Sequence, residues 1–152
     1  MIPQLVSLNL HACEYIIAGG FFTSKIHNEV PRDIDLFFLD PLKTLTFNRD
    51  NFPDIDKESN IEYINNKNIR NAFTLKNSSI NFIYTNFSTA IDVLNSFDYV
   101  HCRVAYLPKT DELFISKNAF YAIKNKFLMI NNTNDAAPFI FREKKFRERG
   151  FI

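Results

Sequence analysis

Short apolar segments alternate with polar ones along this chain, and their lengths predict a mixture of strands and helices. Residues 15–18 form an apolar run of strand length. Residues 33–39 first alternate polar and apolar positions and then become wholly apolar, which is typical of a central buried strand. Three later β-like runs, at 61–64, 69–75 and 80–85, are separated by Asn/Lys turns and predict a meander.

Helix signals lie between and after these strands. A short helix at 21–27 is ended by Pro31, which favours an extended approach to the next strand. Ser88 is a good N-cap for a helix through Leu94. The pattern also predicts helices at 3–13, 41–51, 117–126 and 138–149, strands at 99–107 and 112–115, and a loop at 51–60.

The mixed order of these elements predicts an α+β fold with a mixed sheet flanked by helices. The length of 152 residues predicts a single domain over 1–152. The 17 Phe residues indicate an aromatic-rich core. Glycine is scarce, with 3 in total, so the adjacent pair Gly19-Gly20 is more informative than it would be in a glycine-rich chain.

Charge and cysteine usage narrow the class of protein. The net charge of +1 gives no global basic field for nucleic acid, so basic patches must be judged locally. Cys13 and Cys102 form neither a metal-binding pattern nor a disulfide framework. The N-terminal residues lack the basic and apolar regions typical of a signal peptide, and no run approaches the ~18 apolar residues of a membrane span. We therefore expect a cytoplasmic protein with no membrane partner.

The candidate chemistry is concentrated in the stretch from 15 to 40. Asp33 and Asp35 are separated by one residue in a predicted strand, so both carboxylates point to one face. A divalent cation relieves the repulsion between such groups, and oxygen ligands suit Mg²⁺ or Mn²⁺. Gly19 and Gly20 let backbone N–H groups approach a phosphate, and Arg32 can pair with one. This combination is typical of phosphoryl or nucleotidyl transfer.

The segment AGGFFTSKIHNEVPRDIDLFF resembles the nucleotidyltransferase superfamily with the polymerase-β-like fold. The likeness is to the head domain of tRNA CCA-adding and poly(A) polymerases, and to small stand-alone phage and viral proteins of this type. It implies an enzyme that binds a nucleoside triphosphate such as ATP, with metal held by Asp33 and Asp35. The acceptor hydroxyl would belong to RNA, a protein or a small molecule, and a phage-like protein would act in an infected host cell.

The resemblance extends to two later segments. FDYVHCRVAYLP is similar to a family strand element near the nucleotide sugar, and Asp98 matches its Asp. Asp98 is therefore the candidate third carboxylate, with Glu62 as an alternative. The terminal FREKKFRERGF is similar to the family's Arg-rich helix. The nucleotide-binding residues that the resemblance implies are Gly19, Gly20, Ser24, Arg32, Arg142, Lys145 and Arg149.

Three departures from the family pattern keep other functions open. Thr23-Ser24 stand where the tRNA enzymes have Arg-Asp, and Cys102 stands where they have Asn. The motif that selects the base is not found, so CCA addition is not expected. One alternative is a catalytically degenerate nucleotide- or RNA-binding module of the same fold. A second is an RNA-binding protein without nucleotide chemistry, for which the C-terminal basic residues would carry the binding.

Overall fold

The computed structural model describes residues 15–39, 57–59, 68–75, 78–130 and 136–152. The helices predicted at 3–13 and 41–51, the strand predicted at 61–64, and Glu62 lie outside the described residues.

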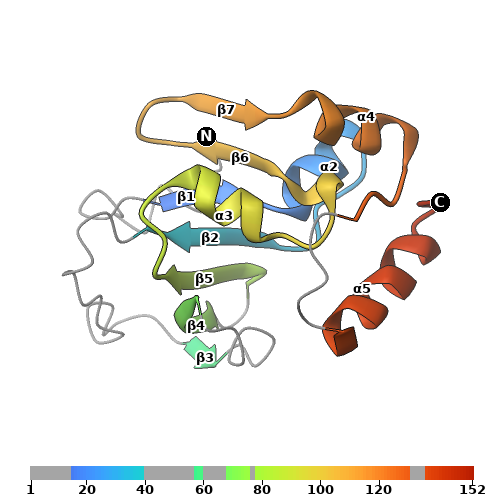
Figure 1. Cartoon of the computed structure of the whole chain (residues 1–152). Helices are drawn as coiled ribbons and strands as arrows, with labels where there is room; N and C mark the ends of the chain where they lie inside the picture. The colour runs from blue at the N-terminus through green and yellow to red at the C-terminus, as the bar shows by residue number, and fades with distance from the viewer. Residues whose placement is uncertain (1–14, 40–56, 60–67, 76–77, 131–135) are drawn as a thin grey trace.

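In this part of the chain, seven strands form one sheet in the order β3-β4-β5-β2-β1-β6-β7 (Figure 1). The strands are β1 (Tyr15–Ala18), β2 (Ile34–Phe38), β3 (Lys57–Ser59), β4 (Ile69–Leu75), β5 (Ile80–Thr85), β6 (Val104–Leu107) and β7 (Glu112–Ile115). β2 and β5 pair in parallel, whereas the other neighbouring strands are antiparallel. The predicted α+β class with a mixed sheet is confirmed.

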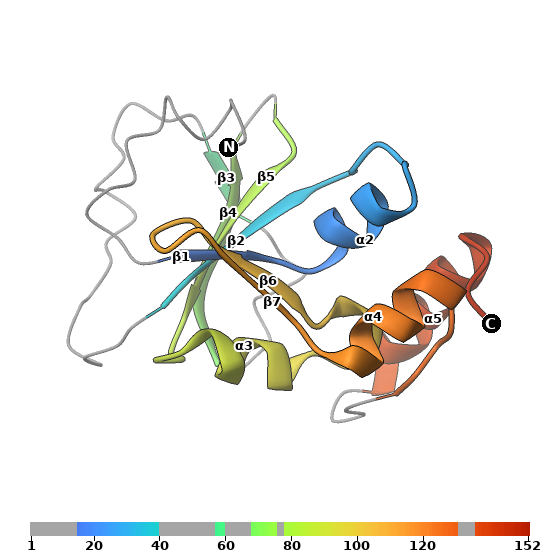
Figure 2. The same ribbon diagram turned by 90° about the horizontal axis from the view of Figure 1, so that it is seen from above.

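Helices cover both faces of the sheet and one of its ends (Figure 2). They are α2 (Gly20–Ile26), α3 (Ala90–Ser96), α4 (Lys117–Asn125) and α5 (Ala136–Glu148), with a 3-10 turn, η3 (Val100–Cys102). α2 packs on one face and α3 on the other, while α4 and α5 are both beyond one end of the strands. Among the described helices, none combines the length and apolarity that a membrane crossing requires.

The two apolar layers follow from the alternation of side chains along each strand. Ile17, Leu36 and Phe82 belong to the layer under α2, whereas their neighbours Ile16 and Phe37 belong to the layer under α3. Both sides of the central strands are thus buried, which explains why their sequences are almost wholly apolar.

Stacked aromatic rings form the centre of the layer under α2. Phe82 stacks on Phe38 with ring centroids 5.6 Å apart and on Phe73 at 5.0 Å. Tyr84 stacks on Phe38 at 4.8 Å. These rings come from β2, β4 and β5, so they join three neighbouring strands. The aromatic-rich core predicted from the composition is present here.

Several predicted elements differ from the structure. The N-cap of α3 is Thr89, whose hydroxyl accepts the Asp92 N–H at 3.2 Å, so the prediction of Ser88 was wrong by one residue. Lys57–Ser59 was predicted as loop but pairs with β4. The strand predicted at 99–107 is interrupted by η3, which separates an isolated bridge between Tyr99 and Ile130 from β6. On α4, predicted at 117–126, the apolar side chain of Phe120 is 49% exposed.

The η3 turn forms because this segment packs against the C-terminal helix rather than against a strand. Tyr99 and Cys102 are buried in a cluster with Phe146 of α5 and with Phe151. The Ile152 N–H donates to the Lys126 carbonyl at 2.8 Å, and the Leu128 N–H donates to the Ile152 carbonyl at 2.9 Å. The last residues are therefore held against the segment that follows α4.

We predict that Phe82→Ala lowers the free energy of unfolding by about 3–5 kcal/mol, because the ring is fully buried and its loss leaves a cavity in the aromatic stack. The matched control is Phe120→Ala, which removes a half-exposed ring and should cost less than about 1 kcal/mol. Chemical denaturation of both variants measures the difference. Equal losses in the two variants would contradict the assignment of the core.

Candidate functional site

The glycine turn lies where the chain passes from β1 into α2. Gly19 has φ 86° and ψ −147°, a backbone conformation that is almost restricted to glycine. Gly20 then begins α2. The strand-turn-helix arrangement predicted from the sequence is confirmed, and it requires glycine at position 19 for a conformational reason.

The register between β1 and β2 brings this turn against Asp35. Ala18 pairs with Asp35 across the antiparallel ladder. A Cβ atom placed on Gly19 would lie 3.6 Å from Asp35 Oδ2. Asp33 and Arg32 precede β2, and both are exposed. The structure therefore unites the glycine turn and the entry to the Asp-x-Asp strand at one place.

Asp35 is also held from the other side of β2, by a residue that the sequence analysis missed. Asn81 of β5 is the register partner of Asp35, and its Nδ2 donates to Asp35 Oδ1 at 2.7 Å. Thr74 Oγ1 of β4 in turn donates to Asn81 Oδ1 at 2.6 Å. The available signal was a single Asn in the otherwise apolar start of the run INFIY.

The donor chemistry of this place fits a divalent cation. Asp33 and Asp35 offer carboxylate oxygens, which hard cations such as Mg²⁺ and Mn²⁺ prefer. Asp35 Oδ2 faces the glycine, where a larger residue would reduce the space beside the carboxylate. In the described part of the chain, no group of three or more His, Cys, Asp or Glu side chains is arranged to hold a metal. From the part of the chain that the structure describes, the candidate site thus offers the two carboxylates of Asp33 and Asp35.

Asp98, the predicted third carboxylate, lies between α3 and η3. Its carboxylate forms an ion pair with Arg142 of α5 at 2.6 Å, and its Oδ1 accepts the Tyr99 N–H at 3.0 Å. Burial raises the pKa of Asp98, while the Arg142 charge acts in the opposite direction. These contacts link Asp98 to the C-terminal helix. Its catalytic role stays a prediction.

Two of the predicted nucleotide-binding residues meet at the end of α5. Arg149 donates to the Ser24 hydroxyl at 3.3 Å and to Glu29 Oε2 at 3.4 Å. Ser24 is buried. Lys126 also approaches Glu29, at 3.6 Å. These interactions fasten the C-terminus to α2 and to the loop that follows it.

The other predicted basic residues on α5 differ in their surroundings. The Arg142 guanidinium pairs with Asp98, as described, and donates to Cys102 Sγ at 3.6 Å. Lys145 is exposed. Burial raises the pKa of the Cys102 thiol to about 11, so the thiol is protonated at neutral pH. Of the predicted cations, Arg32 and Lys145 are the two that solvent reaches most readily.

His101 is a buried histidine in the η3 turn. Its ring lies 4.3 Å from the Phe146 ring and 4.4 Å from the Phe151 ring, between centroids. Neither ring nitrogen has a hydrogen-bond partner among the described residues. Burial is the main cause that lowers the pKa of His101 to about 3, with smaller contributions from Arg142, Arg149 and His27.

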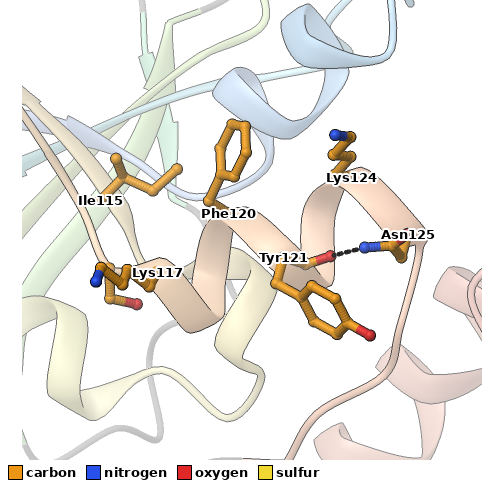
Figure 3. Close-up of a pocket in the computed structure, with 7 residues that line it drawn as sticks. Ile115, Lys117, Phe120, Tyr121, Lys124 and Asn125 are labelled. Atoms are coloured by element: carbon orange, nitrogen blue, oxygen red, sulfur yellow. Dashed lines mark hydrogen bonds between the residues drawn. The ribbon is translucent and has the colours of Figure 1, made fainter.

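A shallow pocket of about 650 Å³ lies along α4 (Figure 3). Phe120 and Lys124 project from one side of the helix and Tyr121 from the other, and Asn125 Nδ2 donates to the Tyr121 carbonyl at 3.0 Å. None of the lining residues is among the predicted site residues. The pocket is therefore built from residues other than those of the glycine turn and the Asp-x-Asp strand.

Sequence comparisons relate this chain to a phage family. A sequence profile of the family described as Gad2, Gabija anti-defense 2 family protein, matches residues 3–126. Gabija anti-defense 2 of Bacillus phage SPbetaL7 is 26% identical over 141 residues, which are 91% of this chain and 34% of that protein. This chain therefore spans about a third of the length of that curated relative.

Comparisons with solved structures identify the fold. The Thermotoga maritima CCA-adding enzyme complexed with tRNA matches with a TM-score of 0.66 and 15% identity, over 100% of this chain and 40% of the enzyme chain. A CCA-adding enzyme in complex with ATP matches with a TM-score of 0.65 and 15% identity, over 98% of this chain and 39% of the enzyme chain. The predicted nucleotidyltransferase fold is confirmed.

We predict that Gly19→Ala lowers the free energy of unfolding by about 1–3 kcal/mol, because φ 86° with ψ −147° strains any residue with a Cβ atom. Gly20→Ala is the matched control. A Cβ atom at Gly20 would have no neighbour within 4 Å, and alanine favours the helix, so this variant should be neutral or more stable. Denaturation curves that give both variants the same free energy of unfolding would contradict the role of Gly19.

The lowered pKa of His101 predicts acid-sensitive stability. In the unfolded chain, histidine titrates near pH 6.5, so between about pH 6.5 and 3 the unfolded state binds more protons than the folded state. Stability should therefore fall by about 1.4 kcal/mol per pH unit as the pH decreases through this window. His101→Phe, which suits the aromatic surroundings, should remove this component. Denaturation at pH 7 and pH 5 measures it, and an unchanged slope in the variant would contradict the assignment.

Proposed function

We propose that this chain, which belongs to the Gabija anti-defense 2 family, is a metal-dependent nucleotidyltransferase. It transfers an NMP from a nucleoside triphosphate to an acceptor hydroxyl. The observation that carries the proposal is the approach of Gly19 to the Asp35 carboxylate, so close that a Cβ atom placed on Gly19 would lie 3.6 Å from Oδ2. The fold shared with CCA-adding enzymes supports the same reaction class.

Asp33 and Asp35 would hold the divalent cations, Mg²⁺ or Mn²⁺. Cations at these carboxylates supply charge stabilisation for the entering and leaving oxygens of a phosphoryl-type displacement. Asp35 is suited to this role because Asn81 fixes one of its oxygens at 2.7 Å. Asp33 precedes β2 and is exposed, so its carboxylate is accessible to a cation that arrives with the substrate.

The triphosphate would lie over the glycine turn. The backbone N–H groups of Gly19 and Gly20 are the donors proposed for its β- and γ-phosphates. Arg32 and Lys145 are exposed and can offset phosphate charge. Ser24, Arg142 and Arg149 complete the proposed binding set. A hydrogen bond from Arg149 to the Ser24 hydroxyl keeps these two side chains together.

In the proposed reaction, the acceptor hydroxyl attacks the α-phosphorus in line with the bond to the β-phosphate. The new P–O bond forms as that bond breaks, and pyrophosphate and a proton are released. The chain orients the α-phosphorus and neutralises the charge that develops on the leaving group. Asp98 is the candidate for a third catalytic carboxylate.

The family name suggests where the acceptor is found. The curated relative is named for action against a phage-defence system, so the proposed acceptor is an RNA, protein or small molecule of the infected host cell. The tRNA and ATP in the titles of the structural neighbours support RNA and nucleotide as partner classes.

A second candidate function is a non-catalytic nucleotide- or RNA-binding module of the same fold. It is favoured by the internal ion pairs that Arg142 forms with Asp98 and Arg149 forms with Glu29. Such a module would retain nucleotide binding but give no pyrophosphate.

We predict that Asp33→Ala and Asp35→Ala each reduce NMP transfer by about 100-fold or more, because each removes a carboxylate that organises charge in the transition state. The protein is incubated with each labelled triphosphate, Mn²⁺ or Mg²⁺, and separately with RNA, protein or small-molecule extracts of host cells. Glu112→Gln is the control, because Glu112 is an exposed carboxylate on β7.

Labelled product that persists in both Asp variants would reject the proposed site. Nucleotide binding without product in the unmutated protein would favour the non-catalytic module.

A further inference from the structure

Asn81 is a buried polar residue in an apolar strand. It is 9% exposed, and its neighbours Ile80 and Phe82 are both in the apolar layer under α2. Burying an amide costs free energy unless its donor and acceptor are both satisfied. Its presence here therefore requires partners on both sides.

Both ends of the Asn81 amide are used. Nδ2 donates to Asp35 Oδ1 at 2.7 Å, and Oδ1 accepts the Thr74 hydroxyl at 2.6 Å. The Asp35 contact assigns the amide orientation, because the opposite orientation would turn the amide oxygen towards a carboxylate oxygen, and the Thr74 hydroxyl then donates to the amide oxygen. Thr74 thus presents the Asn81 NH₂ group to Asp35.

Backbone pairing fixes this row of three side chains. Asp35 and Asn81 are register partners in the parallel pair β2–β5, and Asn81 and Thr74 are register partners in the antiparallel pair β5–β4. Figure 1 shows β2, β5 and β4 following one another across the sheet towards the edge strand β3. The row moves only if the ladders move, so it is a rigid support for the Asp35 carboxylate.

Resting on the proposed function, we infer that Asn81 is a positioning residue for the metal site. It aims the Asp35 carboxylate and, being neutral, it keeps this row at one negative charge. An aspartate at position 81 would place a second carboxylate beside Asp35. The two would repel each other in the absence of a cation and attract a divalent cation more strongly together. The residue at position 81 therefore sets both the orientation of Asp35 and the affinity for the cation.

The test measures Mn²⁺ binding to the full chain by calorimetry and thermal unfolding in chelator and in excess Mn²⁺. Asn81→Ala should weaken Mn²⁺ binding about 10- to 100-fold, as loss of a residue that orients a metal ligand does. Asn81→Asp should lower the unfolding temperature in chelator and show a larger Mn²⁺-dependent rise than the unmutated protein. If the folded Asn81 variants bind Mn²⁺ with the same affinity as the unmutated protein, the inference is overturned.

Thr74 provides a test that leaves Asn81 intact. Thr74→Val removes the hydroxyl but keeps the shape, so the Asn81 amide oxygen loses the donor that holds it in place and Mn²⁺ binding should weaken. Thr74→Ser retains the hydroxyl and should restore binding. If Thr74→Val and Thr74→Ser bind Mn²⁺ equally, the orienting role is rejected, whether or not the Asn81 variants fold.

Asp35→Ala separates this inference from the proposed function. If Asp35→Ala binds Mn²⁺ as the unmutated protein does, the metal site itself is wrong and both proposals fail. If Asp35→Ala loses binding while the Asn81 and Thr74 variants retain it, the proposed function survives and the inference about Asn81 fails.

Discussion

The pairing of β2 with strands on both of its sides is the constraint on which the candidate site depends. β1 places Ala18 opposite Asp35, and β5 places Asn81 opposite Asp35. A slip of one residue in either ladder would turn the Asp35 side chain to the other face of the sheet. The buried layers on both faces oppose such a slip. The strand register that builds the apolar core therefore also positions the polar site.

Local patterns in the sequence were enough to predict β1, the glycine turn, β4 and β5, because alternation and glycine conformation depend on neighbouring residues. The part played by Asn81 could not be predicted in this way. Its partners, Asp35 and Thr74, lie 46 and 7 residues away in the chain. A search of the sequence for metal-binding carboxylates also misses an amide that donates a hydrogen bond to one of them.

The C-terminal helix explains two further differences between sequence and structure. The run around His101 was predicted as strand because its residues are apolar, but Phe146 and Phe151 of the C-terminal region determine its packing. Arg142 was assigned to nucleotide from its family likeness, while the structure pairs it with Asp98. Ionic and aromatic contacts over long sequence separations fixed these residues, and no local pattern records them.

The row of Thr74, Asn81 and Asp35 has a consequence for the evolution of this family. The codons for asparagine and aspartate differ by a single nucleotide, and the two side chains have nearly the same shape. One point mutation at position 81 would therefore change the charge beside Asp35 without requiring the sheet to repack. Selection can adjust the electrostatics of this place in one step, whereas a change at Gly19, with its φ of 86°, would demand a new backbone path.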